Sequence, residues 1–117
     1  MRGSVNTEGT PTVTITLAGQ QWPAIIDTGF NSDLELPEQL RAYVNPRPLG
    51  RISSLFGGGQ TIKEDLFEVD FPFDGAVVAA EATFVPGKDL LIGTRLLSRY
   101  RLGINHFQRT VELERVS

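Results

Sequence analysis

The chain has 117 residues, of which 40% are hydrophobic and 21% charged, and its net charge at pH 7 is -3. This length fits one compact domain with a buried core. The chain has no cysteine, which excludes disulfides and thiolate chemistry, and its single histidine argues against a histidine-rich metal centre. The mild charge and scattered basic residues argue against nucleic-acid binding, and no apolar run is long enough for a membrane span.

The chain is expected to contain one domain, formed by residues 11–117. Residues 1–10 are expected to be an N-terminal segment that is flexible or derived from an expression tag. No secretory signal pattern opens the chain, so we expect a soluble, cytoplasmic protein. We expect it to bind neither a cofactor nor a metal.

The first third of the chain predicts a β-hairpin followed by a helical turn. Hydrophobic residues alternate with threonines over residues 12–17, which is the period of a half-buried strand. The segment "AGQQ" at 18–21 then turns the chain into the apolar segment 22–26. Residues 37–44 begin with a proline, which is tolerated at the first position of a helix, and predict a short helical turn.

The rest of the chain also predicts mostly strands. Residues 51–71 contain two strand-like segments around three glycines at 57–59. The almost continuous apolar run 76–85 predicts a central strand. Residues 94–100 have apolar side chains at helical spacing, and residues 100–116 predict a closing hairpin. The pattern therefore indicates an all-β domain with one short C-terminal helix.

Asp27 stands directly after the apolar residues Ala24, Ile25 and Ile26. A buried carboxylate without a partner costs several kcal/mol, so this position needs an explanation. The Asp-Thr-Gly sequence could be an ordinary turn at the end of a strand, because aspartate and glycine are common in turns. Taken alone, the tripeptide would favour that interpretation.

Three segments in a fixed order favour a more specific interpretation. They are "IIDTG" (25–29), "LFGGGQ" (55–60) and "LLIGTRLL" (90–97). Together they resemble the single-domain retropepsin-like aspartic proteases, a group that includes the retroviral proteases. The resemblance covers about residues 11–116. An isolated Asp-Thr-Gly occurs by chance in many proteins, whereas three ordered elements in one small β-rich domain are a specific signal.

Two longer segments narrow this resemblance. "DTGFNSDLELP" (27–37), together with residues 93–116, looks like the small bacterial and archaeal branch whose motif is Asp-Thr-Gly-Phe. The resemblance implies an all-β, retropepsin-like closed β-barrel with a flap hairpin and one short C-terminal helix, which forms a pepsin-like homodimer. It implies no cofactor.

The chemistry of this group explains a carboxylate at position 27. Two carboxylates that share one proton can activate water: the ionised one accepts a proton from the water while the protonated one polarises the peptide carbonyl. The chain contains one Asp-Thr-Gly, and "FDG" at 73–75 lacks the preceding apolar run. The second aspartate is therefore expected from another copy of the chain. The resemblance thus implies an aspartic endopeptidase that hydrolyses peptide bonds through a water held between two Asp27 carboxylates, one from each subunit of a homodimer.

The resemblance also assigns roles to the neighbouring residues. Gly29 lets the backbone approach the carboxylate and donate its amide, since a side chain there would crowd the site. Thr28 would join the two catalytic loops of the dimer through its hydroxyl. The triple glycine would be the tip of a flap that opens for substrate and closes over it. The implied site comprises catalytic Asp27 with supporting Thr28 and Gly29, flap residues Phe56, Gly57, Gly58 and Gly59, substrate-binding Phe30, Asn31, Ser32, Leu55 and Leu91, and Ile92 and Gly93 of the third segment.

The sequence departs from the retroviral pattern in three places. Phe30 stands where retroviral enzymes have alanine and pepsin-like ones often a hydroxyl residue, so we expect a working pH nearer neutral than that of pepsin. Gly93-Thr94-Arg95 replaces the retroviral Gly-Arg-Asp/Asn, which leaves the role of Arg95 open. The strand pair after the predicted helix has no counterpart in the retroviral pattern. The dimer therefore need not contain the sheet that the two termini of each subunit form in the retroviral enzymes.

Several alternatives remain open. The triple glycine could be a plain hairpin loop, but no Gly-Lys-Ser/Thr follows it as in a phosphate-binding loop. "LLIG" could be only a core strand, and His106 is expected to be a turn residue of the last hairpin. Ser53 or Ser54 with His106 could suggest a serine triad, but there is no nucleophile-elbow context. The main functional alternative is a catalytically silent retropepsin-like domain that serves peptide binding or dimerisation, and a weaker one is a β-barrel adaptor.

Overall fold

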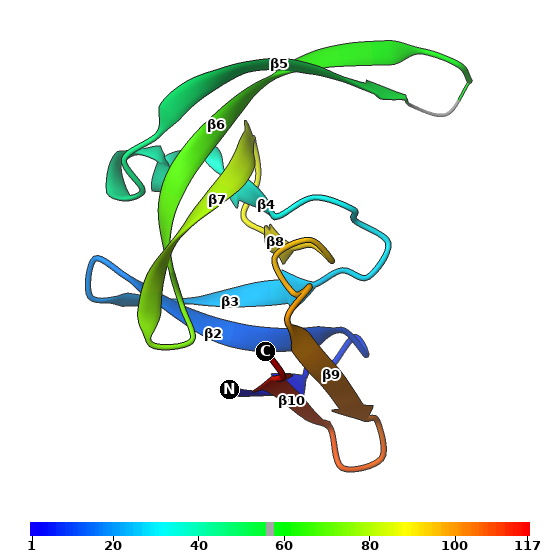
Figure 1. Ribbon diagram of the computed structural model, residues 1–117. Helices are drawn as coiled ribbons and strands as arrows, with labels where there is room; N and C mark the ends of the chain where they lie inside the picture. The colour runs from blue at the N-terminus through cyan, green and yellow to red at the C-terminus, as the bar shows by residue number, and fades with distance from the viewer. Residues whose placement is uncertain (56–57) are drawn as a thin grey trace.

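The computed structural model describes residues 1–55 and 58–117. In these residues the chain forms ten strands and one short 3₁₀ helix, with no helix long and apolar enough to span a membrane (Figure 1). The elements are β1 (Arg2–Val5), β2 (Pro11–Leu17), β3 (Gln20–Ile26), β4 (Leu34–Pro37), η1 (Glu38–Tyr43), β5 (Arg47–Leu55), β6 (Thr61–Phe73), β7 (Ala76–Val85), β8 (Leu90–Ile92), β9 (Tyr100–Asn105) and β10 (Thr110–Arg115).

All ten strands belong to one sheet, in the order β5-β6-β7-β4-β8-β3-β2-β1-β10-β9. The prediction of an all-β fold is confirmed, and the apolar run 76–85 is a central strand, β7, between β6 and β4. The prediction of a closed barrel is wrong. Closure would require the end strands β5 and β9 to pair, but β5 belongs to a hairpin that arches away from the body of the molecule, and β9 lies at the other end of the fold (Figure 1).

The hairpin β2–β3 brings the chain to Asp27. Ala18 and Gly19 form its two-residue turn, and both have positive φ angles, 51° and 76°. Such turns match the right-handed twist of paired strands, which fixes the register of the hairpin. The pairing holds from Leu17↔Gln20 to Thr12↔Ile25, so β3 ends with Ile26 in the core and Asp27 immediately beyond it.

The hairpin β5–β6 is the long arm at the top of Figure 1. Its strands pair from Arg47↔Glu68 to Leu55↔Thr61, with an irregularity between Pro48 and Gly50. Gly58 and Gly59 lie in the connection between β5 and β6, with φ angles of 85° and 79°, which suit glycine. Of the predicted flap residues, Phe56 and Gly57 lie outside the described residues.

The predicted C-terminal helix is not present. Residues 94–99 form consecutive turns, in which the Ser98 amide donates to Arg95 and the Tyr100 amide to Leu97, three residues back in each case. A segment this short cannot sustain an α-helix by itself. It is held instead by the amides of Thr94 and Arg95, which donate to a loop elsewhere in the chain.

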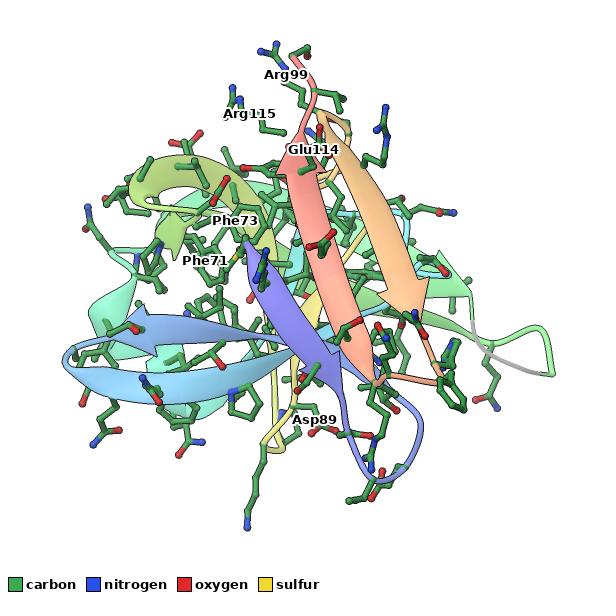
Figure 2. All side chains as sticks on the ribbon, turned by 90° about the horizontal axis from the view of Figure 1, so that it is seen from below. Phe71, Phe73, Asp89, Arg99, Glu114 and Arg115 are labelled. Atoms are coloured by element: carbon green, nitrogen blue, oxygen red, sulfur yellow. The ribbon has the colours of Figure 1, made fainter. Side chains whose placement is uncertain are left out.

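The two ends of the chain complete the sheet. β1 lies between β2 and β10, with Gly3 opposite both Val13 and Val111. A side chain at Gly3 would overlap the carbonyl of Thr12, so the glycine permits this close pairing. Figure 2 shows β1, β10 and β9 side by side. The predicted closing hairpin is therefore present as β9–β10, with His106 in its turn.

The core lies on the inner face of this folded sheet. Its largest members, such as Phe71, Ile15 and Leu34, have less than 2% of their surface exposed. The rings of Phe71 and Phe73, labelled in Figure 2, stack with centroids 6.4 Å apart. Phe73 also contacts Tyr100 edge-on, with ring centroids 5.4 Å apart. Burial of this apolar surface is the main stabilising contribution, at about 25 cal/mol per Å².

Candidate active site

Asp27 lies where two parallel strands end together. β3 pairs in parallel with β8, with Ile26 opposite Ile92 at the end of the ladder. The backbone amide of Asp27 donates to the carbonyl oxygen of Ile92 at 2.9 Å, which extends this pairing by one residue. The first and the third sequence motif therefore meet at Asp27, although more than 60 residues separate them in the chain.

The loop after Asp27 holds its carboxylate. The Gly29 amide donates to Oδ1 of Asp27 at 3.0 Å, and the Phe30 amide donates to the Asp27 carbonyl oxygen at 3.1 Å. A Cβ on Gly29 would lie 3.3 Å from Oδ1, so a side chain there would press on the carboxylate. Asp27 is half-buried, whereas Thr28 and Gly29 are exposed. One carboxylate oxygen is thus fixed by the backbone while the group remains accessible.

The Gly93 segment packs against the same loop. The amide of Gly93 donates to the carbonyl oxygen of Asp33 at 2.9 Å, that of Thr94 to Phe30 at 2.8 Å, and that of Arg95 to Ser32 at 3.2 Å. Gly93 is buried, and a Cβ on it would overlap the carbonyl oxygen of Ser32. Three successive donors thus fix the loop that carries the candidate substrate-binding residues.

Asp33 is a support of this loop that the sequence did not reveal. The residue is only 8% exposed, and its Oδ2 accepts a hydrogen bond of 2.9 Å from the Glu81 amide on β7. The Arg95 guanidinium in turn donates to the Glu81 carboxylate at 2.6 Å. The pKa of Arg95 is raised by this hydrogen bond and then by the charges of Asp33 and Glu81. Arg95, whose role the sequence left open, therefore ties the Gly93 segment to β7.

Glu35 faces the same region as Asp27. It lies opposite Leu91 of β8, which lies opposite Ile25 of β3, so the three side chains share one face of the sheet. Burial raises the pKa of Glu35 above its usual value of 4.5, and the negative charges of Glu64 and Asp27 raise it further. Glu64 belongs to the β5–β6 hairpin, so the charges that act on Glu35 come from this hairpin and from Asp27.

The structure brings together most of the residues that the sequence selected. Phe30, Asn31 and Ser32 form the loop between β3 and β4, in which Asn31 is exposed and the other two are half-buried. Leu91 is half-buried, and Ile92 is buried in the core. Leu55 ends β5, but its side chain lies outside the described residues.

Two other sequence features do not join this site. Ser53 and Ser54 belong to β5 and His106 to the β9–β10 turn, and β5 and β9 are the first and last strands in the order of the sheet. Asp74 of the "FDG" sequence lies in the β6–β7 turn and accepts a hydrogen bond from the Tyr100 hydroxyl. Within residues 1–55 and 58–117, no three His, Cys, Asp or Glu side chains are grouped so that they could hold a metal ion.

Solved structures with a similar fold include several proteases. The chain superposes on a retropepsin-like aspartic protease from Rickettsia conorii with a TM-score of 0.68 and 16% identity, over 97% of this chain and 88% of that one. It matches the simian foamy virus protease with a TM-score of 0.58 and 20% identity, over 74% and 91%. It matches the EIAV protease, solved with the inhibitor HBY-793, with a TM-score of 0.59 and 17% identity, over 80% and 89%.

These matches establish the retropepsin-like fold of the chain. The expected resemblance to this class is therefore confirmed at the level of structure. No protein-family model and no curated protein matches the sequence. The narrower Asp-Thr-Gly-Phe branch stays a prediction.

Proposed function

We propose that the protein is an aspartic endopeptidase whose active form is a homodimer. The observation that supports this most directly is the placement of Asp27 at the common end of β3 and β8, with Oδ1 held by the Gly29 amide. An accessible carboxylate in a fixed orientation can act as a general base toward a water molecule. The fold shared with the aspartic proteases named above supports the same assignment.

The mechanism needs a second carboxylate. Two Asp27 side chains related by a two-fold axis would share one proton, because two like charges about 3 Å apart do not both ionise readily. The ionised carboxylate then accepts a proton from the attacking water, and the protonated one donates to the peptide carbonyl. The exposed Thr28 is available to the partner's loop, and the β5–β6 hairpin would close over the peptide.

A peptide library tests the proposal. Wild-type protein is incubated with a diverse set of peptides at several pH values, and cleavage sites are read by mass spectrometry. The Asp27→Asn variant keeps the shape of the side chain but can neither accept the proton nor carry the shared one, so we expect a loss of activity of about 10²–10⁴-fold or more. Peptide binding without hydrolysis by the wild type would instead support a catalytically silent, peptide-binding domain.

A further inference from the structure

The arrangement of the chain ends restricts how two copies can associate. β1 has a neighbour on both sides, β2 and β10. The strand β10 of the same chain therefore occupies the edge of β1 along which a second copy could otherwise add a strand. Within the described sheet only β5 and β9 have one neighbour each. Edge strands expose unpaired amides and carbonyls, which can pair with another chain.

The two edge strands differ in their suitability for pairing. β5 contains Pro48, which has no amide hydrogen, and its register shifts between Pro48 and Gly50. Both features protect an edge against pairing. β9 contains no proline and pairs with β10 in a continuous register from Tyr100↔Arg115 to Asn105↔Thr110.

The position of β9 also fits a two-fold axis near Asp27. In Figure 1 β3 runs toward the side of the molecule on which β9 lies, and the β5–β6 hairpin extends toward the same side. Figure 2 shows from below that β9 lies outside β10 on this side. A second copy placed against β9 would therefore also face the candidate catalytic loop.

We propose that two copies of the chain associate through antiparallel pairing of β9 with β9 of the partner, centred on Gly103. The need for two Asp27 residues rests on the proposed function, whereas the free edge of β9 does not. The result would be one continuous sheet across the dimer, in which each copy contributes β1, β10 and β9.

The side chains of β9 fix the centre of this pairing. The two-fold axis of this pair lies between the two β9 strands and perpendicular to the sheet, so each face of the sheet stays on its own side. The axis must therefore be level with one residue, which pairs with its own copy in the partner subunit. Leu102 lies opposite the buried Leu113, and Ile104, which is 36% exposed, lies opposite the buried Val111. An axis at Gly103 places Leu102 opposite Ile104 of the partner subunit, and each would cover apolar surface of the other.

Gly103 also allows a direct test. A Cβ at this position meets no atom within 4 Å, so substitutions there leave the fold of the single chain intact. The protein has no cysteine, so Gly103→Cys introduces a single thiol. Residues opposite each other in an antiparallel pair have Cα atoms about 4.5–5.5 Å apart, within the range of a disulfide. We expect Gly103→Cys to form a disulfide-linked dimer under mild oxidation, and Val77→Cys, at a highly exposed residue of β7, to form none.

A charge exchange provides an independent test. Gly103→Lys places two like charges opposite each other, which should raise the dimer dissociation constant up to about five-fold. Gly103→Glu should do the same, and an equal mixture of the two variants should dimerise at least as tightly as wild type. Analytical ultracentrifugation measures all three, and circular dichroism checks that each variant remains folded.

The outcomes separate this proposal from the proposed function. A wild type that stays monomeric, or dimers that neither cross-link at position 103 nor respond to the charge exchange, would overturn the β9 interface even if peptides are cleaved. Cross-linking and charge rescue in a protein that cleaves no peptide would support the interface and count against the endopeptidase.

Discussion

Gly93 and Phe30 are packed so closely that a Cβ on Gly93 would lie 2.6 Å from the carbonyl oxygen of Phe30. The same carbonyl accepts the amide of Thr94 at 2.8 Å, so the contact cannot open without breaking a hydrogen bond. The absence of a side chain at position 93 therefore allows the third motif to close on the loop that follows Asp27.

Gly93→Ala should accordingly lower the stability of the fold. Overpacking at a buried position costs about 1–3 kcal/mol, and displacement of the loop should also reduce any peptidase activity. Denaturant unfolding measures the first effect. Gly103→Ala is the matched control, because a Cβ there meets open space, and it should change the free energy of unfolding by less than about 0.5 kcal/mol. Equal effects of the two substitutions would show that the packing at Gly93 is not critical.

Glu35→Gln should stabilise the protein at neutral pH. The folded state raises the pKa of Glu35 above 4.5, so between 4.5 and the raised value the folded state binds more protons than the unfolded state. The contribution of Glu35 to stability is therefore complete below pH 4.5 and is lost as pH rises through the folded pKa. Removing the charge should raise the unfolding midpoint at pH 7.5 and leave it unchanged near pH 4, as measured by denaturant titrations at both pH values.

Asp70 provides a control of opposite sign. Its pKa is lowered from 3.8 by hydrogen bonds from Arg47 and then Asn45, so it contributes stability above 3.8 that is lost as pH falls. Asp70→Asn should therefore destabilise the protein at pH 7.5 more than at low pH. A Glu35→Gln variant that behaves like Asp70→Asn would show that Glu35 is not held among other negative charges.

Replacing Gly58 by valine should impair turnover more than stability. Gly58 has a φ angle of 85°, which a β-branched residue adopts only at a cost of about 1–2 kcal/mol. If the β5–β6 hairpin closes over the peptide, this strain should lower kcat/KM. Gly58→Asn is the control, because asparagine tolerates positive φ and should retain more activity. A change in melting temperature with unaltered kinetics would make this loop purely structural.

Much of the fold could be predicted from local patterns. The alternation over residues 12–17 and the turn after it defined the hairpin that places Asp27, and steric reasoning anticipated the Gly29 amide beside the carboxylate, which the structure contains. The turns at residues 94–99 could not be distinguished from a helix, because their apolar spacing is the same. Their amides at Thr94 and Arg95 are held by distant carbonyls that no local pattern reveals.

Pairing between strands far apart in the chain explains the remaining differences between the predicted and the observed fold. β1 has no clear alternation, and its place depends on β2 and β10, which lie on either side of it. The closed barrel was an expectation from the resemblance, and β5 and β9 do not meet. Asp33 could have been noticed as a carboxylate between a loop and the apolar residues of β4, but its acceptor role depends on Glu81, 48 residues away.

The last prediction concerns the shared catalytic pair, the step on which the proposed mechanism depends. If each active site contains one Asp27 from each chain, a mixed dimer of wild type and Asp27→Asn has one carboxylate and should be nearly inactive. After subunit exchange at equal concentrations, random pairing leaves about a quarter of the dimers fully wild type, compared with half of the chains if each works alone. Specific activity should also fall on dilution below the dimer dissociation constant, by mass action. Activity that follows the wild-type chain concentration linearly in both experiments would rule out the shared pair, and Asp27 would then need a partner carboxylate within its own chain.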